Sequence, residues 1–333
     1  MRYRRVICAS KAALGGAIQR VPALDGLRAA AIAVVVVYHI DSAVLPAGHY
    51  SVTLFFVLSG YVVTGSLCAE MDRTGRVDLG SFYRRRVLRL VPALLAVCLA
   101  MVAVGIGWSR LIAVLGFYAN YARIEGLDLE RLTHTWFIAV IVHFYLLWPL
   151  AIAGLRARHR TLVVGGLALA AIAWRATAIE VMSPGWVYNA TDTNAAALLV
   201  GCYLAVAQPT PWRFAKWSVP ALLALMLVPA FDVTGTTIFW GGFLALALSA
   251  LTVQYALTGP VWLANSVLLR VAEMSFGLYL WHYVLIRSDI ALWLALALTF
   301  AATAASWYLL ERPVLRWAAR RKSQARTLPA LSA

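Results

Sequence analysis

Long apolar runs follow one another along almost the whole chain and constrain its fold more than any other feature. Ten of them approach the roughly 20 residues that a helix needs to cross a bilayer. They lie at residues 27–46, 50–68, 87–107, 135–154, 161–179, 194–208, 217–231, 237–257, 271–286 and 290–310. With 62% hydrophobic and only 13% charged residues, the chain lacks the polar surface of a soluble domain. We therefore predict an all-α polytopic membrane protein of about ten transmembrane helices.

The basic residues predict how these helices are oriented. With ten spans and a cytoplasmic N-terminus, all but five of the 29 lysines and arginines fall on the cytoplasmic side, Arg28 included. The exceptions are Arg110, Arg123, Arg131, Arg175 and Arg287. Because cytoplasmic segments of membrane proteins are rich in basic residues, we expect both termini in the cytoplasm of a bacterial cell and the chain in its inner membrane. The net charge of +15 then reflects orientation in the membrane, and we expect no nucleic-acid partner.

An eleventh run, at 111–121, is too short to cross and is predicted to be re-entrant or interfacial. We expect one membrane domain at 21–317, with basic cytoplasmic tails at 1–20 and 318–333. The four cysteines show no CxxC spacing, so neither a disulfide framework nor a zinc site is predicted. No P-loop, GxSxG or HExxH motif occurs, and we predict no bound metal or cofactor.

Arg28 and His39 stand out in the first apolar run. Eleven positions at 100° each place both side chains on one face of a helix, about 16 Å apart along its axis. Ionisable groups within a membrane helix are costly and mark functional sites, so we predict a catalytic pair in which His39 is a general base. Two structural alternatives remain open. His39 can hydrogen-bond a neighbouring helix, and Arg28 can form an interfacial ion pair with Asp25.

A second candidate site is the arginine cluster that opens the third apolar run. Its guanidinium groups suit phosphates, which predicts a donor-binding role for Arg85, Arg86 and Arg89. A stop-transfer cluster beside anionic lipid is the alternative interpretation.

Further polar and aromatic residues are candidates for acceptor binding or for support of the site. They are Asp25, Ser59, Trp136, His143, Asp192, Asn194 and His282. Ordinary structural roles compete with each of these predictions, such as close helix packing near Ser59, an aromatic belt for Trp136 and helix capping by residues 191–194.

Seven segments, in this order, resemble the acyltransferase family 3 of integral membrane O-acyltransferases. They are LDGLRAAAIAVVVVYH, LFFVLSGYVVTGSL, FYRRRVLRLVPAL, HTWFIAVIVHFYLLWPL, TDTNAAALLVGCYLA, SFGLYLWH and LERP, across residues 22–313. The resemblance implies an enzyme that moves an acyl group, commonly acetyl, from cytoplasmic acyl-coenzyme A to a hydroxyl of a carbohydrate or lipid-linked glycan. Arg28 and His39 match the family's essential pair, and Arg86 and Arg89 match its second arginine motif.

Several positions depart from the family pattern. Apolar or neutral residues replace acidic or basic ones at Thr53, Ile141, Val142, Asn194 and Ala196, and Phe137 replaces a serine. Three interpretations remain open: an unusual, more apolar acceptor, a compensating role for His143, or impaired catalysis. A lipid or glycan transporter is a further alternative, although the sequence shows no clear internal repeat.

Overall fold

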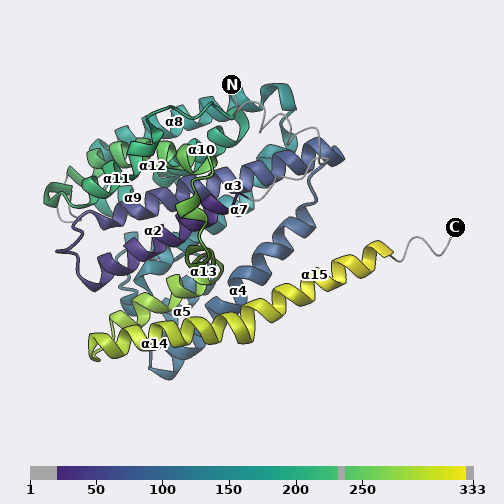
Figure 1. Ribbon diagram of the computed structural model, residues 1–333. Helices are drawn as coiled ribbons and strands as arrows, with labels where there is room; N and C mark the ends of the chain where they lie inside the picture. The colour runs from purple at the N-terminus through teal and green to yellow at the C-terminus, as the bar shows by residue number, and fades with distance from the viewer. Residues whose placement is uncertain (1–20, 232–236, 328–333) are drawn as a thin grey trace.

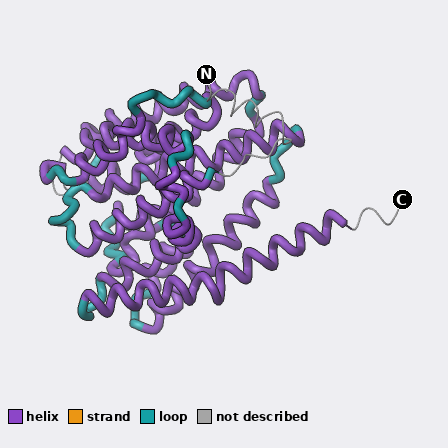
Figure 2. Tube along the Cα trace, in the orientation of Figure 1, coloured by secondary structure: helices purple, strands orange, loops and turns teal. Residues whose placement is uncertain are grey.

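The computed structural model describes residues 21–231 and 237–327. Within those residues every regular element is helical (Figure 2). The longer helices, apart from the last one, pack side by side as a bundle (Figure 1). They are α2 (Pro22–Ile40), α3 (Ser51–Thr74), α4 (Leu79–Ala103), α7 (Trp136–Gly154), α8 (Arg160–Val181), α10 (Thr191–Ala207), α12 (Thr237–Leu257), α13 (Ser266–Ile286), α14 (Leu292–Ala305) and α15 (Arg312–Thr327).

Eight segments of the described chain are long and apolar enough to cross a membrane, which confirms the all-α polytopic fold. They are Pro22–Ile40, Gly48–Thr74, Leu79–Ala103, Glu130–Gly154, Ala157–Val181, Pro184–Ala207, Phe239–Leu257 and Leu292–Ala318. Two predicted spans are not among them. One contains only the nine-residue helix α11 (Ser218–Met226), and the other is α13, which carries Arg270 and Glu273. The total of ten spans and the position of the termini therefore stay predictions.

The run at 111–121 forms two short helices, α5 (Trp108–Leu115) and α6 (Ala119–Ile124), separated by a break. The eight residues of α5 extend about 12 Å, so neither helix is long enough to cross, as predicted.

The first helix ends earlier than its hydropathy suggests. The predicted run extends to residue 46, but α2 stops at Ile40 because Asp41 adopts an extended conformation. The Asp41 carboxylate accepts a hydrogen bond from the backbone N–H of Ala43, 2.8 Å away, which stabilises a turn in place of another helical turn. His39 therefore lies in the last turn of α2.

The third helix begins earlier than predicted. Gly75 ends α3 with φ 72°, a left-handed conformation that glycine adopts without strain. The Asp78 carboxylate then caps α4 by accepting the N–H of Ser81 at 2.9 Å. Since α4 starts at Leu79, the arginines at 84–89 lie within its first turns.

Helices α3 and α10 approach each other closely. A Cβ atom added to Gly60 would lie 2.0 Å from the carbonyl oxygen of Leu198, and one added to Gly201 would lie 2.0 Å from that of Val57. Small residues of this kind allow membrane helices to approach backbone to backbone.

Helices α2 and α13 run in the same direction. Arg28, near the start of α2, contacts Ser275, whereas His39, at its end, contacts His282. In the ten-span prediction these are the first and ninth spans, which must be parallel.

At the other end of the chain, α14, a π-helical segment (Ser306–Glu311) and α15 follow without a break, and α15 extends away from the bundle (Figure 1). The predicted domain boundary at residue 317 falls inside α15, while the predicted tail at 1–20 lies outside the described residues.

Candidate functional site: a histidine pair at an aromatic cavity

A cavity of about 650 Å³ opens where α2 and α13 end. Its size is typical of a small-molecule site. Exposed loop residues Asp41 and Ser42 form part of its rim, and Arg123 and Arg287 also line it. Seven aromatic side chains also line it: Tyr38, Trp136, Phe137, Tyr188, Phe239, Tyr279 and Tyr283.

His39 lines this cavity and is joined to a second histidine. Its Nδ1 lies 3.0 Å from Nε2 of His282, and Nδ1 of His282 lies 3.1 Å from the carbonyl oxygen of Leu278. A carbonyl oxygen can only accept, so His282 carries its proton on Nδ1. With His282 neutral, its Nε2 accepts and Nδ1 of His39 donates. The lone pair of a neutral His39 therefore resides on Nε2.

Packing holds the two imidazoles in place. His282 is fully buried, and the ring of Tyr283 meets that of His39 edge to face at 4.8 Å. A third histidine, His134, lies 5.7 Å from His282 and 5.0 Å from Tyr283 between ring centroids, and it also lines the cavity. His134 is not among the site residues predicted from the sequence. Its position directly before Thr135 and Trp136, in one of the family-like segments, was the available signal.

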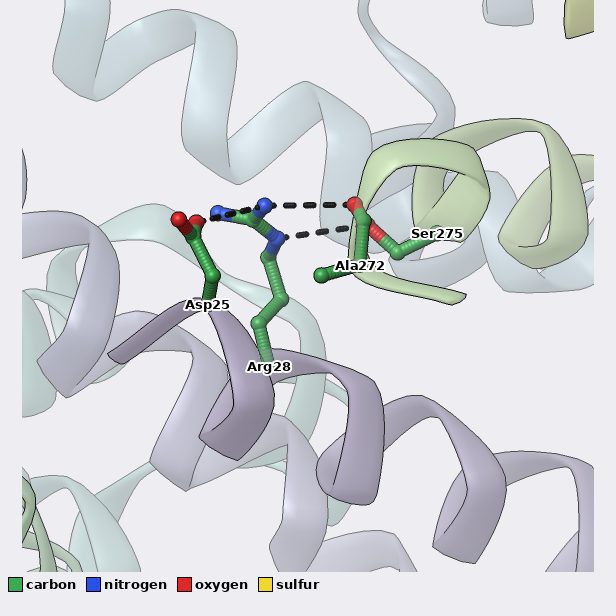
Figure 3. A network of polar contacts seen from close by, with 4 residues as sticks. All are labelled: Asp25, Arg28, Ala272 and Ser275. Carbon is green, nitrogen blue, oxygen red and sulfur yellow. Dashed lines mark hydrogen bonds and ion pairs between the residues drawn. The ribbon is translucent and has the colours of Figure 1, made fainter. Parts of the chain in front are cut away.

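Arg28 lies at the opposite end of α2, where it contacts Asp25, Ala272 and Ser275 (Figure 3). Its Nη2 is 2.9 Å from the Asp25 carboxylate and donates to the carbonyl of Ala272 at 3.2 Å, and its Nε donates to Ser275 Oγ at 3.2 Å. Arg28 and His39 thus share the helix face that packs on α13, as predicted. Arg28 does not line the cavity that contains His39, and its catalytic role stays a prediction.

The arginine cluster of α4 is also remote from the cavity lining. Arg86 is partly buried, with its guanidinium carbon 3.5 Å from the centre of the Phe82 ring and 5.1 Å from that of Tyr145. Arg85 and Arg89 are exposed on the same helix end. The donor-binding role of Arg85, Arg86 and Arg89 stays a prediction.

The remaining candidates divide into cavity residues and residues that connect helices. Trp136 lines the cavity, whereas His143 and Asp192 do not. His143 Nδ1 lies 2.7 Å from Thr191 Oγ1, which joins α7 to the start of α10. The Asp192 carboxylate accepts two indole N–H groups, from Trp174 at 2.8 Å and from Trp186 at 3.2 Å. Ser59 lies partly buried in α3, outside the cavity lining.

A second cavity of about 30 Å³ adjoins the first, with which it shares His49, Val52, Trp136, Tyr188 and Phe239. Two of the departures from the family pattern, Thr53 and Asn194, line it together with Arg175. The Asn194 amide nitrogen donates to the carbonyls of Tyr188 at 3.0 Å and Ala190 at 2.8 Å. Of the other departures, Phe137 lines the first cavity, and Ile141, Val142 and Ala196 are buried among apolar side chains.

The fold is a helical bundle with membrane-spanning segments and a cavity lined by histidines, which is compatible with an integral membrane acyltransferase. The comparison with known families supports this class, because the family model described as "Acyltransferase domain" matches residues 21–311 of this chain. The chain belongs to this family, the acyltransferase family 3 of the sequence resemblance.

Among individual proteins, the chain is similar to "O-acetyltransferase OatA" of Staphylococcus aureus strains NCTC 8325 / PS 47 and COL. Each is 31% identical over 304 residues, an alignment that covers 80% of this chain and 50% of the relative. The chain therefore spans about half the length of these relatives. No solved structure matches it.

Proposed function

We propose that this protein is an O-acyltransferase that moves an acyl group, commonly acetyl, from acyl-coenzyme A to a hydroxyl of a carbohydrate or lipid-linked glycan. The observation that carries the proposal is the hydrogen-bond chain from the Leu278 carbonyl through His282 to His39. It leaves the lone pair on Nε2 of a histidine that lines an aromatic cavity. The names of the relatives, O-acetyltransferases, support the same reaction class.

The proposed reaction begins when Nε2 of His39 accepts the proton of the acceptor hydroxyl. The hydroxyl oxygen attacks the thioester carbonyl, and a tetrahedral intermediate forms. Its collapse forms the ester and expels the coenzyme A thiolate, which takes the proton back from His39. Throughout, the Nε2 of His282 accepts the Nδ1–H of His39, so it orients the ring and stabilises the transient imidazolium.

The cavity wall suits a carbohydrate acceptor. Aromatic side chains present flat apolar faces together with hydroxyl or indole groups that form hydrogen bonds, as sugar rings require. The exposed guanidinium groups of α4 suit the phosphates of the anionic donor.

The impaired-enzyme alternative depends on the acidic positions that this chain lacks. The structure places Ile141 and Val142 in apolar cores, where their side chains complete the packing. The histidine pair itself is intact, so we favour an active enzyme.

The test compares the purified full-length protein with His39→Ala, using labelled acetyl-coenzyme A and glycans or lipids from the source membrane. Mass spectrometry then detects the added acetyl group. We expect transfer by the wild type and a loss of at least about 100-fold in His39→Ala. His159→Ala, at an exposed histidine of the 3₁₀ turn Ala157–His159, is the matched control.

Normal transfer by His39→Ala would refute the general-base role. Movement of a glycan across liposomes without covalent change would instead favour a transporter.

A further inference from the structure

Among the described residues, Arg175 has no carboxylate partner. It lies in the span formed by α8, and its Nη1 donates to the carbonyls of Thr193 at 3.2 Å and Val187 at 3.5 Å. In the described ranges no carboxylate lies within ion-pair distance of it. Charged groups inside membrane proteins are expensive to retain, and an arginine without a counter-ion marks a place where an anion can bind.

The surroundings of Arg175 leave room for such an anion. The guanidinium lines the small cavity next to the aromatic one. Gly242 faces it from α12, and a Cβ atom added there would lie 3.4 Å from Nη2. A water molecule needs about 10–15 Å³ of such space, so a cavity of about 30 Å³ accommodates a group of two oxygens but no sugar ring.

The lining favours a carboxylate over a neutral group. A planar guanidinium presents parallel N–H donors that match the two oxygens of a carboxylate. Thr53 adds a hydroxyl, and Trp136, Tyr188 and Phe239 exclude water, which strengthens a charge-assisted hydrogen bond. A neutral group would leave the charge of Arg175 uncompensated.

We propose that the small cavity is a subsite for the carboxylate of an acidic sugar, bound by Arg175 while the sugar ring occupies the aromatic cavity. This inference rests on the proposed function, because it names the class of acceptor that His39 would deprotonate. Five shared lining residues make the two cavities neighbours, so one ligand can occupy both.

Binding of glucuronate tests the proposal independently of catalysis. The purified full-length protein is titrated with sodium glucuronate or with the uncharged methyl ester of glucuronic acid, at matched ionic strength, and the Tm is measured. We expect the acid to raise the Tm by about 2 °C or more, and the ester to raise it by less than half as much. In Arg175→Gln the acid and the ester should have equal effects.

Two further variants are controls for misfolding and for nonspecific charge effects. Thr53→Asp places a carboxylate at the same cavity and should remove the response to glucuronate while it preserves the folded state. Arg131→Gln should retain the response. Arg131 pairs with Asp289, 3.6 Å away, and lines neither cavity.

Equal shifts from the acid and the ester in the wild type, or no shift from either, would overturn the proposal. An acid-specific shift that persists in both Arg175→Gln and Thr53→Asp would overturn it too. None of these outcomes bears on His39, whose role is decided by acyl transfer.

Discussion

One backbone carbonyl determines which nitrogen of His39 can act as a base. The oxygen of Leu278 fixes the proton of His282 on Nδ1, and His282 in turn fixes that of His39. A neighbour that holds the tautomer of a catalytic histidine also raises its basicity and limits its rotation. The two histidines should therefore act as a unit in the proposed reaction.

We predict that His282→Ala lowers kcat for acyl transfer by about 10- to 100-fold and changes the acceptor KM little. The reason is that His39 loses the acceptor for its Nδ1–H while the cavity wall around it remains. Steady-state kinetics on purified protein measure both parameters. Ser288→Ala, which removes a hydroxyl bonded to Val284 at the end of the same helix, should leave both unchanged. An equal loss in the two variants would assign His282 a packing role only.

Sequence periodicity alone predicted that Arg28 and His39 share a face, and the structure confirms it. Their partners Ser275 and His282 are more than 240 residues away along the chain, and no local pattern specifies which helix lies opposite. The same limit concealed Arg175, which appears in the sequence as one more basic residue outside the motifs. Its significance arises from the small cavity, whose lining comes from several helices far apart in the sequence, among them α3, α7, α8, α10 and α12.

At the scale of helices, the contact between α3 and α10 depends on two glycines. We predict that Gly201→Ala lowers the free energy of unfolding by about 1–3 kcal/mol, because the added methyl group would meet the Val57 carbonyl at 2.0 Å. Thermal unfolding in detergent measures the change.

Gly166→Ala is the matched control for this prediction. Gly166 lies inside α8, and an added Cβ atom there would meet nothing within 4 Å. It should be neutral or stabilise the protein by up to about 1 kcal/mol through helix propensity. Equal stability of the two variants would show that α3 and α10 do not pack as closely as the structure has them.

Hydropathy predicted where most helices lie but not where they start and stop. Those limits depend on single residues, such as Asp41, which ends α2, and Asp78, which caps α4. The charged side chains of Arg270 and Glu273 also lower the mean hydropathy of α13, although this helix carries His282. A helix that pairs with other helices needs less apolar surface than one that faces lipid on all sides.

For the whole molecule, the structure separates the two predicted binding regions. The cavity with His39 lies at the end of α2, whereas the arginines of α4 lie near that helix's start. If the N-terminus is cytoplasmic, α2 runs outward and α3 returns. The cavity then faces the outer side, and the α4 arginines face the cytoplasm, where acyl-coenzyme A is made. Donor and acceptor would reach the protein from opposite sides of the membrane.

Cysteine labelling in intact cells tests this orientation. In a variant whose native cysteines are replaced by serine, we predict that Ser42→Cys, at the cavity rim, reacts with a membrane-impermeant maleimide added outside. Arg76→Cys, an exposed position between α3 and α4, should react only after the membrane is permeabilised. The reason is the bias of basic residues toward the cytoplasm, which places Arg76 among the inner segments. Labelling of Arg76→Cys in intact cells, with Ser42→Cys protected, would reverse the orientation and place the His39 cavity on the cytoplasmic side.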